Sequence, residues 1–194
     1  MKLVHLLALL LLSEPHISNA NLVDDATQQL LSAAGSGDIE NVRAALSQNP
    51  RLNERGGGGQ TALMSSCLRG YADVALLLLS HGADINIGEK DGYTCLHGAG
   101  FQGRHDVAAR VLEAYPNAPN GAHTDGFHPI HRACWGREQR HTNTVRAFLN
   151  AGVPHDIRTG SGETPLDISR RIGNKATEAV LVEAAGSAGE RDAL

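Results

Sequence analysis

The chain repeats itself at a fixed interval, which restricts its possible folds more than any other feature. The stretch "QTALMSSCLRGYADVALLLLSHGADIN" begins at Gln60, and "TCLHGAGFQGRHDVAARVL" begins at Thr94, 33 residues after Thr61. Both place Thr, Leu, Gly and an apolar run at matching offsets. A period of roughly 20–50 residues is typical of repeat architectures, in which similar units stack on one another.

The same register runs through five copies. With Thr61 as position zero, the equivalent residues are 33, 33, 34 and 36 residues apart, at Gln28, Thr61, Thr94, His128 and Thr164. Position two is apolar in every copy, at Leu30, Leu63, Leu96, Ile130 and Leu166. Glycine occupies position nine in four copies, at Gly37, Gly70, Gly103 and Gly173. A further glycine lies two residues before zero in four copies, at Gly59, Gly92, Gly126 and Gly162.

This pattern predicts two short helices and a hairpin-like loop in each copy. The position-nine glycine follows the first helix, where a left-handed residue commonly ends a helix. The glycine before position zero suits a loop tip, where a positive φ is often needed. The fourth copy needs about three extra residues within "GREQRHTN" to keep the register. Since neither helix can bury its apolar face alone, the copies must stack.

The motifs resemble those of the ankyrin-repeat family, most closely "DGYTCLHGAG" from Asp91 and "LLLLSHGADIN" from Leu76. The resemblance implies an all-α solenoid of about five helix-turn-helix repeats joined by hairpin-like loops. The repeats are expected near residues 25–57, 58–90, 91–124, 125–160 and 161–186. The first and last copies depart most from the pattern, as capping units do.

Residues 1–20, "MKLVHLLALLLLSEPHISNA", have the composition of a signal peptide. Lys2 precedes a short apolar run, and small residues at Ser18 and Ala20 suit cleavage. The apolar run is shorter than the roughly 20 residues that cross a bilayer. We therefore expect a periplasmic or secreted protein without a membrane anchor after cleavage, with a repeat domain at 21–186 and a polar tail at 187–194. The alternative is a buried N-terminal helix.

Net charge and cysteine content further restrict which kinds of protein the chain can be. The net charge of −4 argues against general nucleic-acid binding. Cys67 and Cys134 share position six, two repeats apart, and Cys95 lies at position one between them. Helix axes pack about 8–10 Å apart, whereas a disulfide needs Cα atoms within about 7 Å. We therefore expect three reduced, mostly buried thiols.

No residue set predicts catalysis or a cofactor, so we expect a non-enzymatic protein. The "GAGFQG" from Gly98 matches a dinucleotide-binding motif but lies within a predicted helix, where such a site does not form. Histidines crowd the segment from His128 to His141, which raises the alternative of a metal-binding protein. The favoured interpretation is that His131, like His97, hydrogen-bonds a loop backbone, as the family resemblance implies, so no metal site is predicted.

The remaining candidate is a surface on the first helices, where positions four, seven and eight share one stripe. In proteins that resemble this one, this stripe and the loop tips line a concave groove that binds other proteins. Aromatic and Arg residues dominate binding hot spots. The predicted protein-binding residues are Arg69, Tyr93, Phe101, Gln102, Phe127, Arg132, Trp135 and Arg171. The alternative is that Phe101 or Trp135 fills gaps between repeats.

The expected function is therefore the binding of one protein partner by a chain that is monomeric when free. The resemblance to small exported bacterial ankyrin proteins implies, as an expectation, an immunity protein that neutralises a secreted toxic effector. The alternatives are a helper of a periplasmic oxidative-stress enzyme such as catalase, a metal-binding protein, and a scaffold that self-associates through its ends.

Overall fold

The computed structural model describes residues 24–89, 92–118 and 120–191, and within them the chain forms helices and no strand. The helices follow one another in five pairs. Their bounds are α1 Asp25–Ser36, α2 Ile39–Leu46, α3 Ala62–Arg69, α4 Ala72–Ser80, α5 Cys95–Gln102, α6 His105–Ala114, α7 Pro129–Ala133, α8 Gln139–Asn150, α9 Pro165–Ile172 and α10 Lys175–Arg191. The predicted all-α repeat fold is confirmed, whereas the predicted leader at 1–20 lies outside the described residues.

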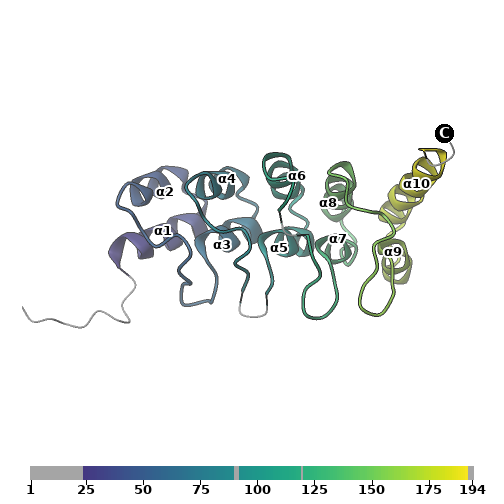
Figure 1. Ribbon diagram of the computed structural model, residues 1–194, viewed down its shortest axis with the longest axis horizontal. Helices are drawn as coiled ribbons and strands as arrows, with labels where there is room; N and C mark the ends of the chain where they lie inside the picture. Colours follow the sequence, from purple (N-terminus) through teal and green to yellow (C-terminus); the bar gives the residue numbers. More distant parts are fainter. Residues whose placement is uncertain (1–23, 90–91, 119, 192–194) are drawn as a thin grey trace, which may run out of the picture.

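The pairs stack in a row, with the first helices in one layer, the second helices in another and the loops hanging below (Figure 1). In the part of the chain described, no helix combines the length and apolar character that crossing a membrane requires.

The periodic residues act at the helix ends as expected. The Thr61 and Thr164 hydroxyls accept hydrogen bonds from the backbone N–H three residues on, each at 3.2 Å. These bonds satisfy N–H groups that the first turn leaves without partners. After α3, Gly70 takes a φ of 91°, and the loop-tip glycine Gly59 takes 79°. Such positive φ values disfavour residues with a Cβ.

The position-two residues meet in one core. Leu30, Leu63, Leu96 and Ile130 are buried in a single cluster, and half-buried Leu166 packs against it. The apolar position-two residues thus share one interior, as the expected stacking of the copies requires. Most of the buried apolar residues are Ala, Leu and Val, with Phe148 the largest fully buried side chain.

Three elements differ from the sequence expectation. Helix α1 begins at Asp25, before the expected zero position Gln28, because Asp24 caps it. In the fourth repeat α7 stops at Ala133, and the inserted residues form a longer link and the start of α8. Helix α10 continues to Arg191, into the segment expected to be a polar tail.

Neighbouring repeats complete one another's helix ends. The Arg104 side chain donates from Nε to the Leu68 carbonyl at 3.0 Å, one repeat earlier. His141 reaches the Phe101 carbonyl at 3.2 Å through Nε2. These carbonyls belong to the last turns of α3 and α5, where helical C=O groups lack intrahelical partners.

Glycines bring the first helices close together. A Cβ at Gly98 would lie 2.9 Å from the Leu68 side chain, and one at Gly100 only 2.3 Å from the Pro129 carbonyl oxygen. The "GAGFQG" segment therefore lies in α5 and its C-cap, as the sequence interpretation expected, and two of its glycines also allow close helix packing.

The expectation of three reduced thiols is wrong for two of them. Cys67 and Cys95 form a disulfide between α3 and α5, with Cα atoms 5.3 Å apart. The helix separation excluded a bridge between Cys67 and Cys134, two repeats apart, but Cys95 at position one was wrongly expected to be poorly placed for a bridge to Cys67. Since Cα atoms lie about 2.3 Å from the axis, facing Cα atoms on helices 8–10 Å apart come within about 4–5 Å. Cys134 is buried and free, as expected.

Candidate functional site

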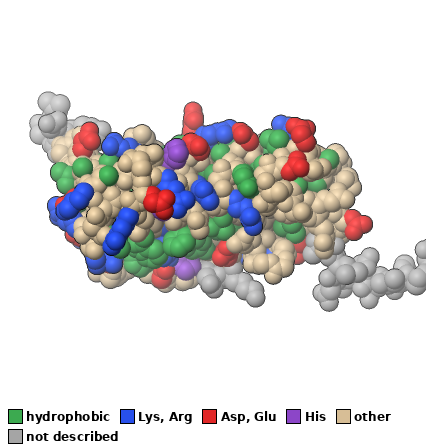
Figure 2. All heavy atoms as spheres, turned by 180° about the vertical axis from the view of Figure 1, so that it is seen from behind, with side chains coloured by type: hydrophobic (Ala, Val, Ile, Leu, Met, Phe, Trp, Pro, Cys, Tyr) green, Lys and Arg blue, Asp and Glu red, His purple; other side chains and the backbone are tan. Residues whose placement is uncertain are grey.

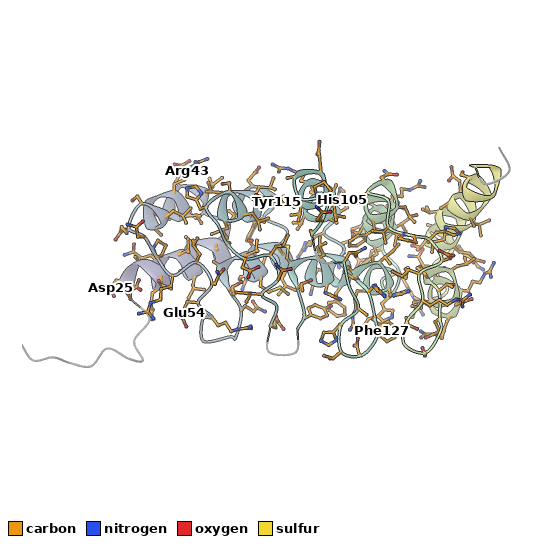
Figure 3. The ribbon with its side chains drawn as sticks, viewed as in Figure 1. Asp25, Arg43, Glu54, His105, Tyr115 and Phe127 are labelled. Atoms are coloured by element: carbon orange, nitrogen blue, oxygen red, sulfur yellow. A yellow bond between two sulfur atoms is a disulfide. The ribbon has the colours of Figure 1, made fainter. Side chains whose placement is uncertain are left out.

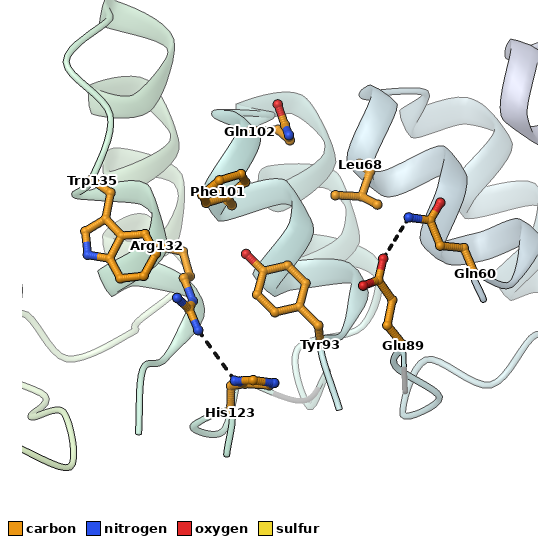
Figure 4. Close-up of a pocket in the computed structure, with 9 residues that line it drawn as sticks. All are labelled: Gln60, Leu68, Glu89, Tyr93, Phe101, Gln102, His123, Arg132 and Trp135. Carbon is orange, nitrogen blue, oxygen red and sulfur yellow. Dashed lines mark hydrogen bonds between the residues drawn. The ribbon is translucent and has the colours of Figure 1, made fainter. Parts of the chain in front are cut away.

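An open pocket of about 480 Å³ lies against the C-terminal halves of α3, α5 and α7 and the loops that precede α5 and α7 (Figure 4). We call it the aromatic pocket. It is lined by Gln60, Leu68, Glu89, Tyr93, Phe101, Gln102, His123, Arg132 and Trp135. The stacking of the second, third and fourth repeats thus brings together residues that are far apart in the sequence.

Arg132 forms the base of the pocket and is held from several sides. It is only 5 % exposed. Its guanidinium carbon lies 4.4 Å from the Trp135 ring centre, 5.3 Å from that of Tyr93 and 5.1 Å from that of Phe127. Its Nη2 donates to the Asp125 carboxylate. Cation–π contacts and a charge-assisted hydrogen bond both favour a single position of the Arg132 side chain. The base of the pocket is therefore ordered before a partner binds.

The charge of Arg132 is balanced locally. Burial acts to raise the pKa of Asp125, but hydrogen bonds from Arg132 and His123 outweigh it and lower that pKa to about 2. His123 Nδ1 lies 3.0 Å from the Asp125 carboxylate and 3.5 Å from Arg132 Nη2. Asp125 is therefore ionised at neutral pH.

An apolar wall stands beside this polar base. Phe101 is 46 % exposed, one of two large hydrophobic side chains that are exposed in the described part of the chain. It meets Trp135 edge to face, with ring centres 6.3 Å apart. Trp135 in turn contacts Phe127 at 5.1 Å, and Figure 3 shows Phe127 near the loop below α7. The aromatic rings therefore support one another while Phe101 stays open to solvent.

The other rim is polar. Gln60 donates from its side chain to Glu89 at 2.7 Å, which joins the loop before α3 to the loop before α5. Burial raises the pKa of Tyr93 to about 12, against the opposing effect of Arg132. Its phenol is therefore neutral at physiological pH and available as a hydrogen-bond donor.

The structure brings most of the predicted binding residues together. Five line the aromatic pocket: Tyr93, Phe101, Gln102, Arg132 and Trp135. Phe127 lies behind them against Arg132. Arg69 lies outside this pocket and lines a separate hollow, and Arg171 lies on α9 paired with Glu163 at 3.0 Å. For all eight residues, a binding role stays a prediction.

Sequence reasoning did not select Gln60, Leu68, Glu89 and His123, which also line the pocket. Leu68 belongs to the position-seven stripe but was passed over in favour of aromatic residues. Glu89 and His123 both lie five residues before position zero, in successive repeats. That shared offset in the loops was the signal that could have identified them.

His97 and His131 are engaged by the backbone, as expected. His97 accepts from Thr94 N–H at 3.4 Å through Nδ1 and contacts the Phe127 carbonyl at 3.2 Å through Nε2. His131 does the same with the His128 N–H at 3.1 Å and the Ile157 carbonyl at 3.0 Å. Burial lowers the pKa of both rings to about 4.

The metal-binding alternative gains no support from these rings. His128 Nδ1 lies 2.9 Å from the Asn120 carbonyl, and His141 contacts the Phe101 carbonyl. Among the residues described, no three His, Cys, Asp or Glu side chains gather as metal ligands would.

The comparisons with known proteins agree with this architecture. The model of ankyrin repeats in three copies matches residues 3–89 and 30–120. The chain is 33% identical over 112 residues to the SMC5-SMC6 complex localization factor protein 1 of Bos taurus, covering 56% of this chain and 10% of that one. It is 31% identical over 144 residues to the mitochondrial disaggregase of Bos taurus, covering 73% and 21%. It is 36% identical over 70 residues to the Notch-regulated ankyrin repeat-containing protein of Homo sapiens, covering 36% and 61%.

These relatives are mostly far longer than the aligned part, since the chain spans from a tenth to about three fifths of their lengths. What they share with it is the stacked repeat. Ankyrin repeats are in general non-enzymatic modules that mediate protein–protein interaction. With five stacked helix pairs among the described residues, a glycine after the first helix in four of them and a matching family model over more than half of its length, the chain belongs to the ankyrin-repeat family.

Proposed function

We propose that this chain is an exported, non-enzymatic protein that binds one protein partner through the aromatic pocket and neutralises it. The observation that carries the proposal is the exposed Phe101 beside a rigid base of Arg132 and Trp135. Trp, Tyr and Arg are the residues most enriched in binding hot spots. Because the base is ordered before binding, little side-chain entropy is lost when a partner docks.

Truncation of the pocket tests the binding site. We expect Phe101→Ala and Trp135→Ala each to weaken affinity for a partner captured from the host's extract by about 2 kcal/mol or more. Val182→Ala is the matched control, because Val182 is the other exposed large hydrophobic residue and lies on α10. Circular dichroism should show all three variants folded. Unchanged affinity in both pocket variants would show that the partner binds elsewhere.

Export is part of the proposal. It is supported by the signal-peptide composition of residues 1–20 and by the Cys67–Cys95 disulfide, since disulfides persist mainly in oxidising compartments. The mass of the protein recovered from its natural host tests this. A mature chain that starts near Asn21 agrees with export to the periplasm or beyond, and a chain that retains residues 1–20 contradicts it.

Neutralisation of a toxic effector is the most specific part of the proposal. A rigid, non-enzymatic binding surface suits an inhibitor that acts by occupying its target. We expect co-production of this chain to protect cells from the captured partner, and the Phe101→Ala variant to protect less. If the partner is instead a catalase or a related enzyme whose activity rises on binding, the helper role replaces the inhibitory one.

A further inference from the structure

A row of arginines borders the aromatic pocket. We call Arg69, Arg104, Arg137 and Arg140 the arginine edge. Arg69, Arg104 and Arg140 line a single hollow of about 210 Å³ together with Gly70, Gly103, His105 and Asp106. Arg69 directly follows Leu68, and Gly103 directly follows Gln102. Because Leu68 and Gln102 line the aromatic pocket, the two hollows adjoin.

The two features lie on one face of the molecule. Figure 2 shows one face of the molecule, on which Lys and Arg side chains lie beside a gathering of hydrophobic side chains. A partner that fills the aromatic pocket would therefore place its neighbouring residues on the arginine edge.

Most of these guanidinium groups form no ion pair with a carboxylate among the described residues. Within residues 24–89, 92–118 and 120–191, Arg69, Arg104 and Arg137 form no ion pair. Arg140 pairs with Glu138 at 2.9 Å, but both side chains are largely exposed, and such pairs contribute little in water. The one acidic residue that lines the hollow, Asp106, lies 3.1 Å from His105.

Two of the arginines are also held in place. Arg104 donates from Nε to the Leu68 carbonyl, and Arg137 donates from Nε to the Ile172 carbonyl, both at 3.0 Å. These bonds engage the Nε of each guanidinium and leave its two Nη groups without a hydrogen bond or ion pair among the described residues. A planar guanidinium with free Nη donors suits a carboxylate, which it can bind in a bidentate manner.

From this juxtaposition we infer that the partner presents an acidic protein segment, with carboxylates on the arginine edge and one large apolar side chain in the aromatic pocket beside Phe101. The inference rests on the proposed function and specifies the chemistry of its partner. A protein segment is favoured over a nucleic acid because the open Phe101 side chain in the pocket offers an apolar contact for a large apolar side chain.

The test uses a random peptide library displayed on phage and selected against the full chain. We expect the selected peptides to be rich in Asp and Glu and to carry a large apolar residue. Synthetic copies should bind more weakly as salt is raised, because salt screens exposed charges. The double variant Arg69→Glu, Arg140→Glu should weaken this binding about tenfold, because each change replaces an exposed attraction to a peptide carboxylate with a repulsion.

The matched control is Arg43→Glu, Arg146→Glu, since both residues are exposed arginines on second helices, α2 and α8. It should leave the affinity unchanged, and circular dichroism should show both double variants folded. The inference is overturned if the selection returns no peptide, if the selected peptides are neutral or basic, or if the two double variants weaken binding equally. It is also overturned if a single-stranded DNA oligonucleotide binds the arginine edge more tightly than the peptides do. Peptides that lose affinity on Phe101→Ala but show no acidic preference would overturn this inference alone. Peptides indifferent to both Phe101→Ala and Trp135→Ala would count against the proposed function as well.

Discussion

Two glycines of α5 provide a sharp test of how closely the first helices pack. Both lie inside a helix, where replacing Gly by Ala stabilises the helix by about 1 kcal/mol. At Gly98 the new methyl group would meet Leu68 Cδ2 at 2.9 Å and Met64 Cε at 3.0 Å. These atoms end flexible side chains, which can move at a cost of about 0.5–1.5 kcal/mol. We therefore expect Gly98→Ala to change the free energy of unfolding by less than about 1 kcal/mol.

At Gly100 the same change meets backbone. The Cβ would lie 2.3 Å from the Pro129 carbonyl oxygen and 3.2 Å from its carbon. An ordinary contact requires α5 and α7 to separate by about 1 Å, and overpacking of this kind costs about 1–3 kcal/mol or more. We expect Gly100→Ala to be about 2 kcal/mol less stable than Gly98→Ala, or about 4–8 °C lower in Tm for a chain of this size.

Urea and thermal unfolding of the two variants, followed by circular dichroism, provide the measurement. The pair is well matched because both changes add one methyl group to the same helix. Equal stability of the two variants would mean that α5 and α7 lie farther apart than described, and the geometry of the aromatic pocket would then also be wrong.

Three further predictions concern stability. Reduction of the Cys67–Cys95 disulfide, whose cysteines are 28 residues apart, should lower the free energy of unfolding by about 3.5 kcal/mol, because the unfolded chain gains entropy. Urea unfolding with and without reductant measures this loss. A protein mass that corresponds to three free thiols would contradict the prediction. Because burial lowers the pKa of His97 and His131 to about 4, the unfolded state takes up protons first. The free energy of unfolding should therefore be highest above about pH 6.5 and fall as pH drops towards 4, by up to about 1.4 kcal/mol per pH unit for each ring. Urea unfolding at several pH values measures this, and the free energy of unfolding should depend less steeply on pH in a His97→Asn variant. Thr164→Ala removes an N-cap and should cost about 1 kcal/mol, which a urea titration would reveal, and no loss would mean that α9 starts elsewhere.

The sequence was informative wherever one residue decides a local conformation. Gly70 ends a helix and Thr61 begins one because a positive φ and a side-chain acceptor are local requirements. The fixed period then carried these assignments to the other repeats. Local rules worked less well in the fourth repeat, where Arg137 replaces the helix-ending glycine and the insertion could be absorbed by either helix or by the link.

Contacts between repeats were harder to predict. The disulfide depends on which faces of α3 and α5 meet, and offsets within the repeat place Cys67 and Cys95 five positions apart. The candidate site has the same character. Phe101 and Trp135 were found from residue type, but Glu89 and His123 reach the pocket only because their loops fold back beside the helices.

The hydrogen bonds between side chains and the carbonyls of neighbouring repeats affect whether one repeat can be replaced by another. Arg104 and His141 occupy different positions in their repeats, yet each serves the helix end of the repeat before it. A consensus unit inserted at either place would supply neither side chain, and a partly buried carbonyl would lose its donor. The units of this chain are therefore matched to their neighbours, and shuffling them should produce poorer stacks than the similarity of their sequences suggests.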